Sequence, residues 1–284
     1  MRMPILLYGI VALAYAVLAL HFWRTRWNAA TAHEAALWER IAILAPLVVH
    51  SWLLYQELFA AAEFRFGFGY ALSCMLWLGV LIYWVESLFV KLEGLQPLVL
   101  GLAALCAPLP ALFPGLVSPP YAHSLPFRLH TVLAMLAYSL FTIAALHAML
   151  MTLVERRLHH RGAGGTGGAQ GGPLAIPLAV LPPLLTLESL LFRLIGLGFV
   201  LLTLTLATGM LNSEEIFGRA LSFSHKTLFA VISWFIFAAL LTGRYFYGWR
   251  GRTALRWTLA GFAALLLAYV GSRFVLEVIL KRGL

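Results

Sequence analysis

The chain has 284 residues, of which 62% are hydrophobic and only 11% are charged. Soluble domains average about 45–50% apolar and about 25% charged residues, so a water-exposed globule of this size is excluded. The composition predicts an integral membrane protein with one polytopic domain over residues 1–284. The net charge of +9 is typical of Lys and Arg gathered in cytoplasmic loops, an interpretation we favour over nucleic-acid binding.

The fold class predicted from hydropathy is an all-α bundle of about eight transmembrane helices, because about 20 apolar residues cross the hydrocarbon core. The first apolar segment is longer than a signal-peptide core of about 7–15 residues, so we expect an uncleaved helix. The run from Pro173 to Pro183 is short and broken by prolines, and is expected at the interface. The expected spans are 4–23, 41–61, 68–90, 95–113, 128–153, 187–211, 226–247 and 254–280.

The loops predict the orientation of these helices. The segments RTRW, VERRLHHR and GRYFYGWRGRTALR follow the first, fifth and seventh spans and are basic. Because cytoplasmic loops carry the excess of Lys and Arg, we expect both termini outside. Residues 162–172, GAGGTGGAQGG, have no preceding strand and no Lys-Ser/Thr after them, so they predict a flexible cytoplasmic linker rather than a phosphate-binding loop.

The sequence shows no catalytic motif. It contains no HExxH, no GxSxG and no nucleotide-binding loop, and we expect a protein that is not an enzyme. Cys74 and Cys106 lie in apolar runs without a CxxC pattern, which is typical of small buried hydrophobic residues.

Three histidines are the candidate metal ligands. His130 opens the fifth span and His225 opens the seventh, so both lie at the outer face, whereas His50 lies near the middle of the second span. Neutral imidazole is an axial ligand of haem iron, and either His225 or His50 could provide the second ring opposite His130. His147 cannot share a haem with His130, because 17 helical residues separate them by about 25 Å. For each candidate, a purely structural role in helix packing is the alternative to ligation.

Two cations accompany the outer histidines. Arg128 precedes His130 by two residues and Lys226 follows His225 directly. Guanidinium and ammonium groups form charge-assisted hydrogen bonds with carboxylates such as haem propionates. The sequence therefore predicts a haem b site, with His130, His225 and His50 as candidate iron ligands and Arg128 and Lys226 as propionate partners.

Several segments of the chain resemble a known family. They are LHTVLAMLAYSLFTIAALHAML, PPLLTLESLLFRLIGLGFVLLTLTLATG, HKTLFAVISWFIFAALLTGRYFYGWRGRTALRWTLAGF and LAYVGSRFVLE. Across residues 128–280 they resemble the cytochrome c assembly protein family of the CcsA type, in its YpjD/HemX-like branch of bacterial inner-membrane proteins. The resemblance implies a multi-pass inner-membrane protein that handles haem in cytochrome c maturation. It places His130 at an outer-face haem-ligand position, and Lys226 and Trp234 at conserved positions of the core.

The chain also departs from the haem-exporting members of that family. Those members carry a Trp-rich outer loop, whereas the corresponding loop here, LNSEEIFGRALSFSHKT, has no tryptophan. A family histidine late in the seventh span is replaced near Thr242, and a second outer histidine after YVGSR is absent. These departures fit the YpjD/HemX-like branch.

Two functional hypotheses follow. In the first, the protein binds haem through His130 together with His50 or His225 and takes part in cytochrome c biogenesis. In the second, it binds no haem and is an accessory or regulatory membrane protein that tunes a membrane or peripheral partner. The expected partners are the lipid bilayer and, in the first hypothesis, haem and cytochrome c maturation proteins.

Overall fold

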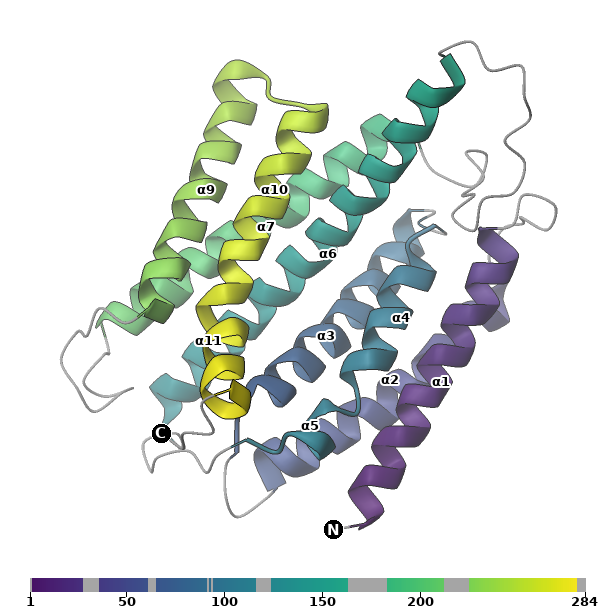
Figure 1. Cartoon of the computed structure of the whole chain (residues 1–284), viewed down its shortest axis with the longest axis vertical. Coiled ribbons are helices and arrows are strands. Elements are labelled where there is room, and N and C mark those ends of the chain that lie inside the picture. The colour runs from purple at the N-terminus through teal and green to yellow at the C-terminus, as the bar shows by residue number, and fades with distance from the viewer. Residues whose placement is uncertain are drawn as a thin grey trace.

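The computed structural model describes residues 2–27, 36–60, 65–90, 92, 94–115, 124–162, 183–211 and 225–279, and these residues form helices and short connections (Figure 1). The first group of helices comprises α1 (Arg2–Arg26), α2 (Leu37–Tyr55) with the π-helical turn η1 (Gln56–Ala60), α3 (Phe68–Phe89), α4 (Gln96–Cys106) and α5 (Leu109–Leu112). The second group comprises α6 (Leu125–Gly162), α7 (Leu184–Leu211), α9 (His225–Tyr247), α10 (Gly251–Leu266), η4 (Leu267–Gly271), α11 (Ser272–Phe274) and η5 (Val275–Ile279).

The expected all-α membrane architecture is confirmed. Within the described residues, seven helices are long and apolar enough to cross a membrane, and Gln96–Leu112 forms a shorter apolar one. The expected span over 95–113 is thus a short helix interrupted near Pro108, which precedes α5. Proline removes a backbone donor and clashes with the preceding turn, which explains the break. The predicted linker over 162–172 lies outside the described residues apart from Gly162, the last residue of α6.

Successive helices alternate in direction once the shorter segment of α4 and α5 is included, so the start of α1 and the end of η5 lie at the same end of the bundle, the lower end in Figure 1. We call it the outer end, after the orientation predicted from the loops. The starts of α6 and α9 and the end of α7 lie at this end as well.

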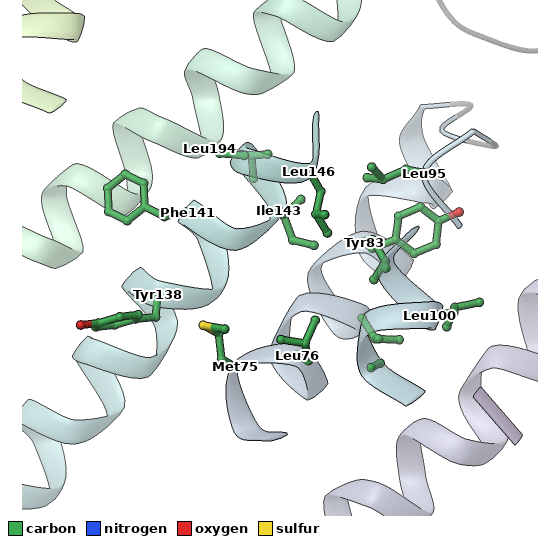
Figure 2. Close-up of a cluster of buried hydrophobic side chains, with 14 of the residues drawn as sticks. Met75, Leu76, Tyr83, Leu95, Leu100, Tyr138, Phe141, Ile143, Leu146 and Leu194 are labelled. Atoms are coloured by element: carbon green, nitrogen blue, oxygen red, sulfur yellow. The ribbon is translucent and has the colours of Figure 1, made fainter. Parts of the chain in front are cut away.

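The core lies where the two groups of helices meet. Figure 2 shows Met75 and Leu76 of α3 on the side of α6, and Tyr83 of α3 beside Leu95 and Leu100. The α6 side chains Ile143 and Leu146 are less than 3% exposed, and α6 also packs against α7 and α10. Helix α6 is therefore the central element, and it carries His130 toward the outer end.

Two tryptophans join α2 to α3. The indole nitrogen of Trp77 donates to the Leu47 carbonyl at 3.1 Å, and that of Trp84 donates to the Arg40 carbonyl at 3.0 Å. Both rings therefore serve helix packing, as an amphipathic aromatic side chain with a satisfied N–H can.

Candidate functional site

His130 lies in the second turn of α6, where its imidazole faces the last turns of α7. Its Nδ1 is 3.1 Å from the Thr208 hydroxyl. The contact is close, because a Cβ added to the neighbouring Gly209 would lie 3.1 Å from His130 Cε1. The side chain is half-buried, so the ring is oriented by α7 without being sealed inside the bundle.

The bonds of Thr208 favour one tautomer of His130, whose ring also has a backbone hydrogen bond at Thr205. The hydroxyl donates to the Leu204 carbonyl at 2.9 Å and also lies 3.1 Å from the Thr205 carbonyl. Since its hydrogen is directed to the backbone of α7, the hydroxyl accepts from Nδ1–H of His130. The neutral ring then has its lone pair on Nε2. Metal-ligating histidines commonly donate their other nitrogen to such a partner, which fixes the ring and its tautomer.

His225 is the first residue of α9, and its side chain is exposed. Helices α6 and α9 both pack against α7, so His130 and His225 belong to helices on either side of one element and lie at the same end of the bundle (Figure 1). Arg128 is exposed on α6, and Lys226 is partly buried on α9. The structure therefore places these four residues at the outer end, as their depth in the sequence predicts.

An aromatic pair lies between α7 and α9. The indole of Trp234 stacks on Phe199 with ring centroids 5.3 Å apart, and its N–H donates to the Thr203 hydroxyl at 2.9 Å. Sequence reasoning alone does not identify four residues of this region, namely Thr208, Gly209, Phe199 and Thr203. The segment LTLTLATG places threonines at 203, 205 and 208 in an otherwise apolar helix, and this is the signal that could have revealed them.

His50 lies in a different environment. Its side chain is fully buried, and its Nε2 is 2.8 Å from the Ser73 hydroxyl of α3. The rings of Tyr8 and Tyr15 on α1 surround it, with centroids 6.4 and 5.8 Å from the imidazole. His50 therefore contacts α1 and α3, whereas His130 contacts α7. As a candidate second ligand it has less support from the geometry than His225.

The donor set at the outer end suits haem better than a bare metal ion. Among the described residues, no group of three or more His, Cys, Asp or Glu side chains could hold a metal ion. Haem iron receives four nitrogens from its own macrocycle and needs only one or two axial ligands from the protein. A half-buried imidazole that contacts a hydroxyl of α7, at the same end as the exposed Arg128 and the partly buried Lys226, fits that requirement.

The GWRGR segment lies at the opposite, inner end. Gly248 and Gly251 adopt φ of 65° and 53°, a region that favours glycine. The turn folds the Trp249 indole onto Gly243, where an added Cβ would lie 2.4 Å from the ring. Arg244 donates to Glu188 at 2.6 Å and lies 4.6 Å from the centre of the Phe192 ring. These contacts fasten α9 to α7, so the motif has a structural role far from His130.

The chain is similar to proteins of one known family. The family model described as "Cytochrome C assembly protein" matches residues 38–280. The inner membrane protein YpjD of Escherichia coli K12 is 33% identical over 150 residues, which cover 53% of this chain and 52% of YpjD. The cytochrome c biogenesis protein CcsA of Gloeobacter violaceus is 38% identical over 92 residues, or 32% of this chain and 27% of that protein.

The match therefore spans about half the length of YpjD and a smaller share of CcsA. The family match is far longer, since it begins in α2 and ends just past η5. It includes the described helices that follow α1, and with them the outer end that carries His130 and His225. The chain belongs to the cytochrome c assembly protein family.

Proposed function

We propose that this protein takes part in cytochrome c biogenesis in a bacterial inner membrane, and that it binds haem b at the outer end of α6, α7 and α9. The observation that carries the proposal is the bond between His130 and Thr208. It orients a half-buried imidazole at the position that the family resemblance assigns to a haem ligand.

The residues around His130 supply the other requirements of an amphiphilic anionic ligand. His225 is the candidate second ligand, because it is exposed at the same end of the bundle. Arg128 and Lys226 provide cations for the propionates, and the stacked pair of Phe199 and Trp234 provides apolar surface on α7 and α9. Imidazole nitrogens would thus hold the haem iron, and Arg128 and Lys226 would bind the propionates at the membrane surface.

Titration of the purified protein with haemin tests the proposal. We expect a Soret band typical of b-type haem, and the spectra of the oxidised and reduced forms report the axial ligands. His130→Ala should abolish or strongly weaken binding, and added imidazole should partly restore it, because free imidazole can occupy the vacated ligand position. Only one of His225→Ala and His50→Gln should change the spectrum, and we expect it to be His225→Ala.

The competing hypothesis is an accessory membrane protein without haem, and the absence of tryptophan from LNSEEIFGRALSFSHKT favours it. It would be supported if the folded protein binds no haem in either oxidation state. If all three histidine variants leave the haem spectrum unchanged, the proposed ligands are wrong. Size-exclusion profiles of the variants establish that a lost spectrum reflects lost ligation and not lost folding.

A further inference from the structure

An apolar groove opens near the outer end of the bundle, where the two groups of helices meet. Its volume is about 440 Å³, within the range of about 300–1,000 Å³ that is typical of ligand sites. One wall comes from α3 and α5, and the other comes from η4 and α11. Figure 1 shows α5 and α11 on either side of the start of α3. The described residues that line the groove lie outside α6, α7 and α9, so it is separate from the proposed haem site.

Backbone contact fixes the shape of the first wall. A Cβ added to Gly69 of α3 would lie 2.8 Å from the carbonyl oxygen of Leu109 and 2.9 Å from that of Phe113. Only glycine allows two backbones to approach this closely. The ring of Phe68 packs on that of Phe113, with centroids 4.9 Å apart. The groove is therefore bounded on this side by a wall that cannot move inward.

Irregular helix forms the second wall. The π-helical turns η4 and η5 flank the short α11, and π-helical turns are frequent at functional sites. Leu267 is 51% exposed and Phe274 is 42% exposed, although both line the groove. The ring of Phe274 meets that of Phe68 edge-on, with centroids 5.5 Å apart. Since η4 and α11 end an apolar span, this exposure means that the groove opens toward lipid.

The lining decides which chemistry the groove can hold. Every described residue in it is an apolar side chain or a glycine. A polar molecule would leave its hydrogen-bonding groups unsatisfied there, and the lining has no axial ligand for haem iron. An acyl chain has no hydrogen-bonding groups, and it gains van der Waals contact with both walls. The groove therefore suits a hydrocarbon chain.

Two arginines lie beside the groove. Arg273 directly precedes Phe274, and its guanidinium carbon is 5.9 Å from the centre of the Tyr269 ring. Tyr269 packs against Phe66, with ring centroids 6.0 Å apart and its hydroxyl 3.5 Å from the Phe66 carbonyl oxygen. The exposed Arg65 directly precedes Phe66. The contact between Tyr269 and Phe66 thus places both arginines on the same side of the groove.

We propose that the groove binds one acyl chain of an anionic phospholipid from the leaflet at the outer end, with the lipid phosphate beside Arg273 and Arg65. Guanidinium groups form charge-assisted hydrogen bonds with phosphate, and long cationic side chains near helix ends reach the membrane surface. The charged head group complements the arginines, and the acyl chain complements the apolar lining. The site does not depend on haem.

Photolabelling of the full chain in lipid nanodiscs without haem tests the proposal. The probe is phosphatidylglycerol with a diazirine in one acyl chain, and phosphatidylcholine with the same acyl chain is the control for head-group charge. Mass spectrometry of peptides locates the labelled residues. We expect phosphatidylglycerol to label the peptides that contain Phe113 and Leu267 about fivefold more than phosphatidylcholine does, which is the advantage that one cation near the membrane surface provides.

Two variants separate the acyl chain from the head group. Leu267→Trp fills the groove and should reduce labelling there, by both lipids, to the level of the other lipid-facing helices. Leu6→Trp is the matched control, because Leu6 is 65% exposed near the outer end of α1 and does not line the groove. Arg273→Gln should lower labelling by phosphatidylglycerol to the level of phosphatidylcholine, and size-exclusion profiles establish that each variant is folded.

Three outcomes would overturn the proposal. The first is equal labelling of the groove by the two lipids in the unmodified protein, a comparison that needs no variant. The second is labelling spread evenly over all lipid-facing helices. The third is protection of the groove from both probes together with cross-links between two copies of the chain at this position, which would assign the groove to a second copy.

Discussion

Phe141 of α6 and Phe237 of α9 stack with ring centroids 3.9 Å apart and an interplanar angle of 16°. Both side chains are fully buried. A glycine lies against each ring, Gly198 of α7 against Phe141 and Gly261 of α10 against Phe237. The pair therefore joins four helices at one level, and three of them, α6, α7 and α9, carry the proposed haem site.

Because the two rings stack on each other, we expect them to stabilise the folded protein partly through one shared interaction. We expect Phe141→Ala and Phe237→Ala each to lower the free energy of unfolding by about 3–5 kcal/mol. The double variant should lose less than the sum, because one interaction is counted in both single changes. Reversible unfolding in mixed detergent micelles measures these values. Additive losses would show that the two rings contribute independently.

The glycines beside the rings allow a sharper comparison. A Cβ at Gly261 would lie 2.8 Å from Phe237 Cζ, whereas a Cβ at Gly196 on α7 would have no atom within 4 Å. We expect Gly261→Ala to destabilise the protein, since the stacked ring cannot move away. Gly196→Ala should be neutral or stabilising by up to about 1 kcal/mol, the helix propensity difference. Both variants are compared in the same unfolding assay, and equal effects would contradict the packing argument.

Two arginines near the inner end differ in their contacts, so we expect their replacement by lysine to change stability by different amounts. Arg244 donates to Glu188 at 2.6 Å and to the Trp249 carbonyl at 3.4 Å. We expect Arg244→Lys to cost about 1–2 kcal/mol, because an ammonium cannot reproduce several guanidinium contacts at once. Arg252, which is 60% exposed and 3.7 Å from Glu155, is the control. Arg252→Lys should change stability by less than about 0.5 kcal/mol. A larger loss of stability for Arg252→Lys than for Arg244→Lys would show that solvent exposure does not determine how much each ion pair contributes.

The orientation of the bundle remains a prediction from the basic loops. Reporter fusions after Arg161 and after Leu284 should score on opposite sides of the membrane, with the reporter after Arg161 in the cytoplasm. The structure agrees with one part of this expectation, since the start of α1 and the end of η5 lie at the same end (Figure 1). A cytoplasmic reporter after Leu284 would contradict the orientation.

Hydropathy was sufficient to predict most of the fold, because each span must present about 20 apolar residues to lipid. It did not predict the break between α4 and α5, since Pro108 interrupts a segment whose hydropathy is continuous. The positions of His130 and His225 at the beginnings of their spans also predict that both histidines lie at the same end of the bundle. The partner of His130 could not be predicted in this way, because Thr208 lies 78 residues further along the chain and only helix packing brings the two together.

The same limit applies to His50. From sequence it is equivalent to any histidine within an apolar span. Its contacts with Ser73, Tyr8 and Tyr15 come from two other helices, so the register between α1, α2 and α3 decides its environment. Periodicity within α2 alone cannot supply that register.

The cations at the outer end predict an effect on haem affinity. If Arg128 pairs with a propionate, Arg128→Gln should raise the dissociation constant for haemin by about three- to tenfold, and the difference should shrink at high salt because the side chain is exposed. Arg156, also exposed but at the inner end of the same helix, is the matched control, and Arg156→Gln should leave the affinity unchanged. Equal effects of the two changes would indicate general charge attraction in place of a specific contact.

Thr208 provides the most specific test of the proposed haem site. Thr208→Val keeps the shape of the side chain but removes the hydroxyl that accepts from His130 Nδ1–H. Without that acceptor the ring loses its fixed orientation and tautomer, and partners of this kind typically contribute about 10- to 100-fold to metal affinity. Thr208→Val should therefore weaken haemin binding by about tenfold and shift the Soret band, while the protein remains folded. Thr152→Val is the control, because its hydroxyl bonds the Ala148 carbonyl of its own helix toward the inner end of α6, and it should leave the band in place. If both threonine variants bind haemin as the unmodified protein does, His130 is not oriented by α7 for ligation and the proposed site is wrong.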